Sequence, residues 1–300
     1  MAFTNKKTKA AFYSIVSNSF LILLKLISGF LTGSISILSE AVHSFTDLLA
    51  SVIAFFSVKA SSEPADDGHP FGHGKYEDLS GLFEGALIVL AGIYIITESI
   101  HKLIDGVVLS EHLNVGIVVM FISVVVNVFV SRYLFKVAKE TDSMAILADA
   151  EHLRADILTS LGVFAGLIAI KVTGIHIIDP IFAILIALFI FKVGMSLCIQ
   201  SMKNLLDGSL PEEEQNSIQQ IVKSYIPKDI QSIKNLQTRK AGATRFINMT
   251  LIVHDYMTVK EGHFLCDKIE NEIEQNFNHT SIVIHLEPFE NSEDLKHLEI

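Results

Sequence analysis

The chain has 300 residues, of which 50% are hydrophobic and only 19% are charged, and its mean hydropathy is +0.46. This composition excludes an ordinary soluble protein and predicts a protein that is embedded in a lipid bilayer. The net charge is −10 at pH 7, and about −6 of it falls after Asp207, where 15 Asp and Glu face 9 Lys and Arg. Such acidity argues against a nucleic-acid partner.

Six apolar segments are long enough for the ~20 residues that a helix needs to cross a hydrocarbon core. They are roughly residues 11–30, 35–58, 79–104, 113–137, 145–170 and 177–198. Lysines and arginines gather before the first segment and in the links after the second and fourth, whereas the other links offer only Lys102 and Lys171. This asymmetry predicts that both termini lie in the cytoplasm. We expect a protein of the cell (inner) membrane.

Two stretches with the same spacing lie inside the second and fifth segments, EAVHSFTD at 40–47 and DAEHLRAD at 149–156. Each places His and Asp four residues apart, and such residues share one face of a helix. Two of these helices packed together would supply two imidazoles and two carboxylates, from His43, Asp47, His152 and Asp156. This donor set suits Zn²⁺ before Mn²⁺, Mg²⁺ or Ca²⁺, and its two carboxylates balance a divalent charge.

The same four residues suggest an exchange of metal for protons. Charged side chains inside a membrane are costly and mark ion pathways, and metal binding to His and Asp releases protons. The alternative is that the two pairs only bridge helices by hydrogen bonds. Glu40 and Asp149, one turn before each His, are expected either to orient the ligands or to line the path.

Two further charged residues in the apolar segments receive plainer interpretations. Lys25 is expected to extend toward the outer surface from the first segment. Glu84 is expected to be solvated near a helix end, although a place on a proton path is the alternative.

A second, water-soluble domain is expected after Asp207. Its pattern predicts a helix to about Ser224, strands near 230–239 and 244–254, a helix near 259–277 and a last strand near 281–287. We therefore expect two domains, a six-helix transmembrane domain at 1–207 and an α+β domain of αββαβ order at 208–300.

Together these features resemble the cation diffusion facilitator family, in particular its bacterial zinc and iron efflux transporters. The resemblance covers nearly the whole chain: six spans, paired motifs on the second and fifth, a His-rich link and an αββαβ tail. It implies a ferredoxin-like, metallochaperone-type cytoplasmic domain. It also implies a homodimer that is no enzyme and that exports a divalent metal ion from the cytoplasm against protons.

The resemblance also assigns residues. It places the transport site at His43, Asp47, His152 and Asp156. Members with His at the first position of both pairs are typically zinc transporters that often handle cadmium or cobalt, whereas Asp in the second span goes with broader or iron-linked use. His43 therefore favours zinc as substrate, and cadmium, cobalt or iron is the alternative.

The link 65–78, ADDGHPFGHGKYED, gathers acidic and imidazole side chains among glycines that allow a tight wrap. On the residues alone, an acidic, solvated turn is slightly favoured over a metal site. The resemblance reverses that order and assigns a link site to Asp66, His69 and His73. It also implies a dimer charge pair between Lys75 and Asp207.

The tail offers a third candidate metal site. Strand alternation puts His285 and Glu287 on one face, and His263 lies in the preceding helix. The resemblance implies a regulatory cytoplasmic site, but Lys234 and Thr250 stand where some members have further His, so a two-metal cluster is not expected. A single ion completed by His254, Asp255, water or the other protomer is one interpretation; ordinary surface residues are the other.

Two rivals come from other functional classes. A membrane metalloenzyme would hold a catalytic metal in the bundle core, but the chain shows no nucleophile motif and no Glu-x-x-His pair in facing spans. A membrane-tethered metal sensor would need the spans only as an anchor, and an anchor does not require costly buried ligands in two helices.

Overall fold

The computed structural model describes residues 2–32, 35–105, 113–173 and 177–289. It divides into two compact units, Met1–Met202 and Lys203–Ile300, and each is described by itself. The division falls in the last turns of the sixth helix, close to the domain boundary expected after Asp207.

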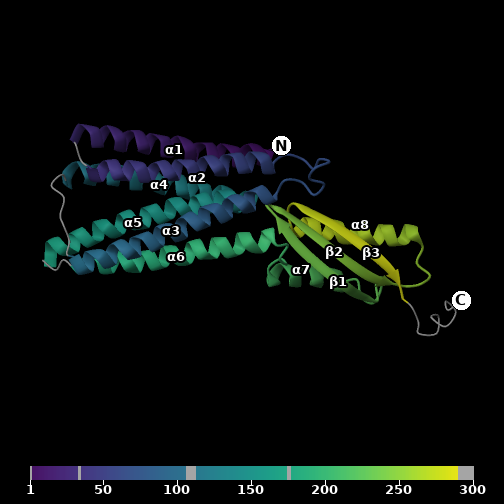
Figure 1. Cartoon of the computed structure of the whole chain (residues 1–300). Helices are drawn as coiled ribbons and strands as arrows, with labels where there is room; N and C mark the ends of the chain where they lie inside the picture. The colour runs from purple at the N-terminus through teal and green to yellow at the C-terminus, as the bar shows by residue number, and fades with distance from the viewer. Residues whose placement is uncertain (1, 33–34, 106–112, 174–176, 290–300) are drawn as a thin grey trace. The chain divides into compact units, whose positions relative to one another are not determined.

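Six long helices make up the first unit (Figure 1). They are α1 (Ala2–Thr32), α2 (Ile35–Ser61), α3 (Lys75–Asp105), α4 (Leu113–Thr141), α5 (Met144–Thr173) and α6 (Ile178–Leu205). They coincide in order with the six expected spans. We call the end that carries the N-terminus, the link 62–74 and the α4–α5 turn the near end, and the opposite end the far end.

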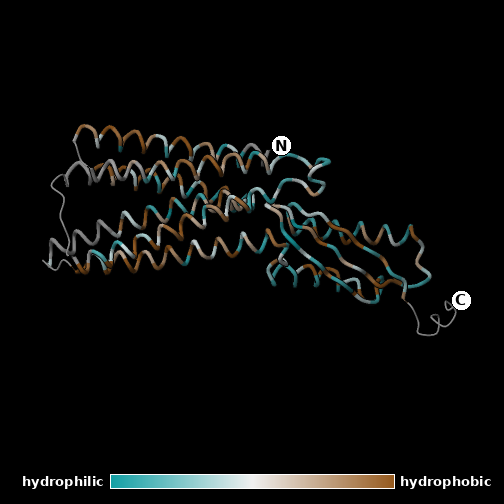
Figure 2. Tube along the Cα trace, viewed as in Figure 1, coloured by the Kyte–Doolittle hydropathy of each residue, from teal (hydrophilic) through white to brown (hydrophobic). Residues whose placement is uncertain are grey.

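The helices of the first unit are apolar along most of their length, whereas the link 62–74 is hydrophilic (Figure 2). Within the described residues, α1, α2, α3, α4 and α6 contain stretches long and apolar enough to cross a membrane. The helix α5 differs because charged residues gather in its first half, namely Asp149, Glu151, Arg154 and Asp156. Charged groups in such a helix must find partners inside the protein.

Small side chains allow the helices to approach closely. Ala10 and Ala11 of α1 are fully buried in a cluster that also contains Leu134 of α4 and Leu153 of α5. A second cluster joins α3, α5 and α6 through residues that include Ile88. Such close contacts hold helices together in a bilayer, where no hydrophobic force acts between them.

The second unit is a three-stranded sheet with two helices packed against one face. Its elements are α7 (Glu212–Lys223), β1 (Ser232–Ala241), β2 (Thr244–Val253), α8 (Val259–Asn276) and β3 (Thr280–Pro288). The strand order is β1-β2-β3, with β1 antiparallel and β3 parallel to β2, so α8 is the crossover between parallel strands. The αββαβ prediction is confirmed.

The core of the second unit explains which face the helices cover. Ile247 and Leu251 of β2 are fully buried together with Ile218 of α7 and Ile269 of α8. Alternate residues of a strand face opposite sides, so α7 and α8 cover the face that carries Ile247 and Leu251. Thr258 begins α8 with a capping box, in which its hydroxyl accepts from the Glu261 backbone N–H and the Glu261 carboxylate accepts from the Thr258 backbone N–H.

Candidate functional site

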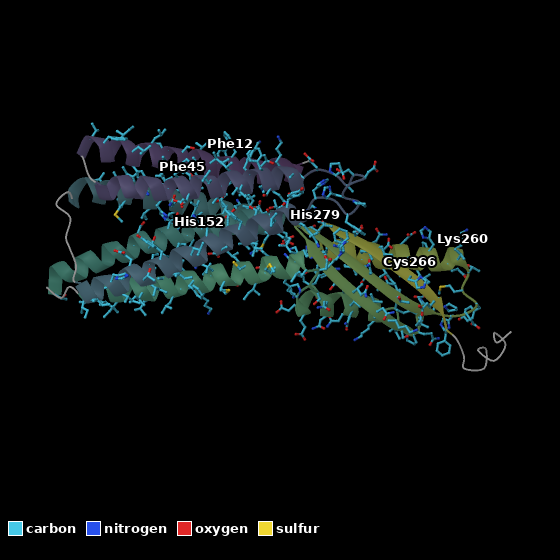
Figure 3. The ribbon with its side chains drawn as sticks, viewed as in Figure 1. Phe12, Phe45, His152, Lys260, Cys266 and His279 are labelled. Atoms are coloured by element: carbon cyan, nitrogen blue, oxygen red, sulfur yellow. The ribbon has the colours of Figure 1, made fainter. Side chains whose placement is uncertain are left out.

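The structure brings the four predicted transport ligands together between α2 and α5. One ligand atom each from His43, Asp47 and Asp156 lie within 4.8 Å of one another. The fourth, His152, has its Nε2 atom 3.1 Å from Asp47 Oδ1. His152 lies within the helical unit (Figure 3). We call these four residues the quartet.

The quartet lies inside the bundle, on two helices that run in opposite directions. His43 is about 12 Å along α2 from the far end, and His152 is about 12 Å along α5 from the near end, at 1.5 Å per residue. Asp47 and His152 are 5% and 8% exposed. His152 Nδ1 is buried without a hydrogen-bond partner in the described part of the chain. The imidazole and two carboxylates that gather within 4.8 Å are a donor set that suits a borderline divalent cation, and the His152 imidazole lies beside Asp47 as a further donor.

A cavity of about 790 Å³ connects the quartet with the far end of the bundle. All four ligand residues line it, and so do Glu98 of α3, Met120 of α4 and Pro180 of α6 in the far halves of their helices. Toward the near end, Ser51 and Asp149 are buried and are absent from the lining residues that the structure describes. The quartet is therefore open to the far end and closed to the near end.

A layer of hydrogen-bonded polar groups closes the near side of the quartet. Ser51 Oγ donates to Asp149 Oδ1 at 3.2 Å and accepts from Asn18 Nδ2 at 2.7 Å, and it shares a hydrogen bond of 3.0 Å with Ser14 Oγ. Asp149 thus joins α5 to α1 and α2. The Glu40 side chain, its expected counterpart, lies outside the described residues.

Glu84 is fully buried, so the expectation that it is solvated at a helix end is wrong. Both of its carboxyl oxygens are buried without a hydrogen-bond partner that meets ordinary geometry in the described residues. One turn earlier on the same face, a Cβ on Gly81 would lie 2.9 Å from Met144 Cγ of α5 and 2.8 Å from Ser201 Oγ of α6, so this face of α3 packs closely against both helices.

A second polar node lies at the near end and centres on Glu77 at the start of α3. Its Oε1 accepts from Lys7 Nζ of α1 at 2.8 Å and from Ser61 Oγ of α2 at 2.7 Å. Its Oε2 accepts from Ser143 Oγ, and Ser143 caps the start of α5 by accepting from the Ile146 backbone N–H. Glu77 is 1% exposed. One carboxylate therefore ties four helices together on the closed side of the quartet.

The link after α2 gathers the predicted link-site residues. One ligand atom each from Asp66, His69 and His73 lie within 4.8 Å of one another. Backbone N–H groups of Gly68 and His69 donate to Asp66 Oδ1 at 2.9 and 2.7 Å. The hydrogen bond from His69, followed by charge interactions with the two imidazoles, holds the pKa of Asp66 below its ordinary 3.8. The carboxyl of Asp66 is therefore ionised at neutral pH.

Packing orients His73 in this link. Its ring stacks on Tyr76 with centroids 6.0 Å apart and planes inclined by 17°, and it is only 7% exposed. The Nε2 atom faces Asp66 Oδ2 at 3.5 Å, while Nδ1 is buried and lacks a partner in the described chain. The three side chains thus converge on one another in this link.

The tail residues of the third predicted site do not converge within one chain. His285 and Glu287 share a face of β3, with 3.8 Å between Nε2 and Oε1, and Lys234 Nζ donates to Glu287 Oε2 at 3.1 Å. His263 is 78% exposed on α8 and lies 3.8 Å from Asp267 instead. The covered face of β3, which includes Leu286, faces α8, so His285 points away from that helix.

The predicted charge pair would join the two units and stays a prediction. Within the second unit, Asp207 Oδ1 accepts from Arg239 Nη1 at 3.0 Å, and Asp207 has a φ of 56°. Lys75 is the first residue of α3 in the other unit.

Sequence reasoning missed how the charged groups around the quartet are partnered. Lys25 does not extend to the outer surface: it is 8% exposed and donates from Nζ to Ser44 Oγ at 2.7 Å. The Glu77 node was not predicted either. The sequence does carry one signal, because a lone charge within an apolar run implies a buried partner. It does not indicate which residue is that partner.

Comparisons with known proteins identify the family of this chain. The family model described as "Cation efflux transmembrane domain" matches residues 11–206, and the one described as "Cation efflux protein, cytoplasmic domain" matches residues 210–289. The transporter sll1263 of Synechocystis sp. is 33% identical over 276 residues, which cover 91% of this chain and 88% of that protein. The cation-efflux pump FieF of Citrobacter koseri is 32% identical over 281 residues, which cover 94% of this chain and 92% of that protein.

Among solved structures, the metal-bound C-terminal domain of the CzcD transporter from Thermotoga maritima is 26% identical and covers 27% of this chain and 92% of that chain. Its TM-score is 0.25.

Proposed function

This chain belongs to the cation efflux family, which is also named the cation diffusion facilitator family, and we propose that it exports Zn²⁺ from the cytoplasm in exchange for protons. The chain is an integral membrane transporter of divalent metal cations and no enzyme.

The observation that supports zinc is the donor set of the quartet. His43, Asp47 and Asp156 place ligand atoms within 4.8 Å, and His152 adds a second imidazole beside Asp47. Two imidazoles and two carboxylates in a small cage match the preference of Zn²⁺ for four nitrogen and oxygen ligands, whereas Mg²⁺ and Ca²⁺ prefer six or more oxygens.

Proton exchange follows from the same chemistry. The hydrogen bond between His152 and Asp47 requires a proton that a metal must displace when it takes the nitrogen. On release, the two imidazoles and two carboxylates can bind protons again, so metal and protons compete for one set of atoms. Alternating access to these atoms then couples the two flows.

The lysine and arginine asymmetry supports a cytoplasmic near end, and with it both termini and the tail in the cytoplasm of an inner-membrane protein. In that orientation, the cavity from the quartet to the far end opens to the outside, and the Glu77 node closes the inside. Export then requires a rearrangement that breaks the near-end contacts and closes the cavity.

The remaining assignments belong to the same proposal. The link residues Asp66, His69 and His73 bind a second metal ion close to the near end. In the tail, a regulatory Zn²⁺ would be held between protomers of a homodimer, since His263 and His285 point in different directions within one chain. The charge pair between Lys75 and Asp207 would stabilise that homodimer.

The test is flux in sealed proteoliposomes with a zinc dye on one side and a pH dye on the other. We expect zinc entry coupled to proton counterflow in the wild type and neither in Asp47→Asn, which keeps the shape of the side chain and removes a charged ligand. Parallel runs with Cd²⁺, Co²⁺ and Fe²⁺ rank the substrates. Zinc flux at the wild-type rate in Asp47→Asn, or zinc flux that is indifferent to a proton gradient, would refute the proposal.

A further inference from the structure

Glu84 of α3 is a buried carboxyl group for which the proposed function of the quartet has no use. It is 0% exposed, and neither of its carboxyl oxygens has a hydrogen-bond partner in the described part of the chain. Glu84 is also absent from the described residues that line the cavity. It therefore belongs neither to the metal ligands nor to the open path from the quartet to the far end.

The groups that face Glu84 do not offer it a lasting positive charge. On α5, Asp149 and His152 interact with it electrostatically, and the His152 imidazole is already hydrogen-bonded to a carboxylate of the quartet. On α6 the titratable group is the thiol of Cys198, and α2 has no titratable side chain at 48–58. An ionised carboxylate in such a place is costly, and a nearby Asp raises the cost. The neutral acid is the form that fits these surroundings.

Two buried hydroxyls lie between Glu84 and the near end. Ser80 is one turn closer to the start of α3 on the same face, and it interacts with the Glu84 carboxyl. Ser201, in the last turns of α6, lies next to them, because its Oγ would be 2.8 Å from a Cβ on Gly81. Both hydroxyl oxygens are buried without a hydrogen-bond partner among the described residues. A hydroxyl can accept one hydrogen bond and donate another, so these two can relay a proton.

A divalent cation in the quartet changes the charge that acts on Glu84. The carboxyl interacts electrostatically with His152, so an ion bound by that imidazole acts on the same carboxyl. The two charges of the ion exceed the one proton that the hydrogen bond between His152 and Asp47 requires. Attraction between opposite charges is strong where water is scarce. A filled quartet therefore favours an ionised Glu84, and an empty quartet favours the acid.

From this arrangement we infer that Glu84 is a proton-binding site of the transport cycle, separate from the metal ligands. It holds a proton while the quartet is empty. When a divalent cation occupies the quartet, the O–H bond of the Glu84 carboxyl breaks and its electron pair stays on the carboxylate. The proton passes by Ser80 and Ser201 to water at the near end. This inference rests on the proposed function of the quartet.

The decisive experiment counts the protons that Zn²⁺ releases when it binds. Calorimetric titration of the full-length protein in nanodiscs, repeated in buffers of different ionisation enthalpy, gives this number. Glu84→Gln keeps the shape of the protonated acid but cannot ionise, so it should release about one proton fewer per zinc than the wild type. Its zinc affinity should accordingly rise less steeply with pH, by up to about tenfold per pH unit. Each chain is measured again with Asp47→Asn added, and the difference isolates the quartet.

Infrared difference spectroscopy observes the proton itself and separates this role from a structural one. The metal-free wild type should show a protonated-carboxyl band that zinc removes and that Glu84→Gln lacks. Glu98→Gln is the matched control, because Glu98 is an exposed carboxyl on the same helix, and it should leave the band in place. Glu84→Asp keeps a carboxyl and should retain both the band and the released proton. Glu84→Met serves if Glu84→Gln does not fold.

The outcomes distinguish this inference from the proposed function. If Asp47→Asn leaves the zinc titration unchanged, the quartet is not the zinc site, and the proposed function fails. If Asp47→Asn abolishes quartet binding while Glu84→Gln and Glu84→Met release as many protons as the wild type, the inference about Glu84 alone is overturned. The same holds if the infrared band of Glu84 persists after zinc has filled the quartet.

Discussion

His152 Nε2 lies 3.1 Å from Asp47 Oδ1, so a hydrogen bond between two buried side chains joins α5 to α2 at the quartet. In the proposed function, the same nitrogen is the metal ligand of His152. The contact that holds the two helices together is thus also the contact that metal binding must replace, which links occupancy of the site to the relation between the helices.

The substitution His152→Asn separates these two roles. Its amide can still hydrogen-bond Asp47, but it is a poor ligand for Zn²⁺. We expect zinc flux to fall at least about 100-fold while the thermal midpoint of the purified protein stays close to that of the wild type. Proteoliposome flux and thermal unfolding in detergent measure the two quantities. A variant that transports normally, or one that fails only because it unfolds, would contradict this division of roles.

The substitution His43→Asp changes the donor set to one imidazole and three carboxylates. Harder oxygen donors favour Mn²⁺ and Fe²⁺ relative to Zn²⁺, so the preference for zinc should shrink. Calorimetric titration with several divalent ions, run on both chains with and without Asp47→Asn, measures the ratio of affinities at the quartet. An unchanged ratio would show that His43 does not set the selectivity.

The link site offers a prediction about pH. The hydrogen bond from the His69 backbone holds the pKa of Asp66 below its ordinary 3.8. The stability that this bond contributes is therefore fully present above pH 3.8. It is lost only as the pH falls through the lowered pKa that Asp66 has in the folded protein. Between pH 5.5 and 8 the carboxylate stays ionised.

Consequently, Asp66→Asn should weaken zinc binding at the link by about tenfold or more, and by the same factor at every pH in that range. Titrations in a chain that carries Asp47→Ala, which lacks the transport site, measure this factor. Asp67→Asn is the matched control, since Asp67 is exposed and outside the gathered trio. A factor that shrinks steadily toward pH 5.5 would mean that Asp66 titrates there.

The Glu77 node predicts a large effect on stability. Glu77→Gln removes the charge that compensates Lys7, whose side chain is only 11% exposed. Loss of one partner of a buried ion pair costs about 3 kcal/mol of unfolding free energy. The control is Glu140→Gln, which breaks the exposed pair with Lys6 and should leave unfolding unchanged. Denaturant unfolding in detergent compares them, and equal effects would contradict the special weight given to the node.

The close contact of α3 with α6 depends on glycines, which have no side chain to keep the two backbones apart. A Cβ on Gly194 would lie 2.9 Å from both the Gly85 backbone oxygen and the Val89 backbone nitrogen, and backbone atoms cannot move aside cheaply. Gly194→Ala should therefore destabilise the protein by about 1–3 kcal/mol. Gly92→Ala, whose Cβ would meet its neighbours at 3.3 Å, should cost less. Thermal unfolding of the two variants tests this order.

The architecture could be predicted from the sequence because the sequence signals for it are local. Six long apolar runs and the alternation of the tail strands reflect the length of a membrane span and the period of a strand, and neither depends on the rest of the fold. The pairs His43 with Asp47 and His152 with Asp156 were found for the same reason, since the i, i+4 spacing alone places them on one face of each helix.

The partners of single charges could not be predicted, because they depend on which helix faces which. Lys25 was expected to reach the outer surface, but α1 packs beside α2 and turns its ammonium to Ser44. Glu84 was expected to be solvated, but it is buried where α3 packs against α5 and α6. His263 and His285 are near in sequence, yet they face different sides of the tail.

The sequence by itself therefore determined that the chain is a membrane protein with a soluble α+β tail and that its second and fifth spans each carry an imidazole and a carboxylate on one face. These properties follow from hydropathy and helical period, which are local. Only the tertiary structure decided that the four side chains meet in one cavity, that this cavity opens to the far end, and that Lys25 shares it. Packing between helices that are distant in sequence determines such contacts, and no spacing along the chain encodes them.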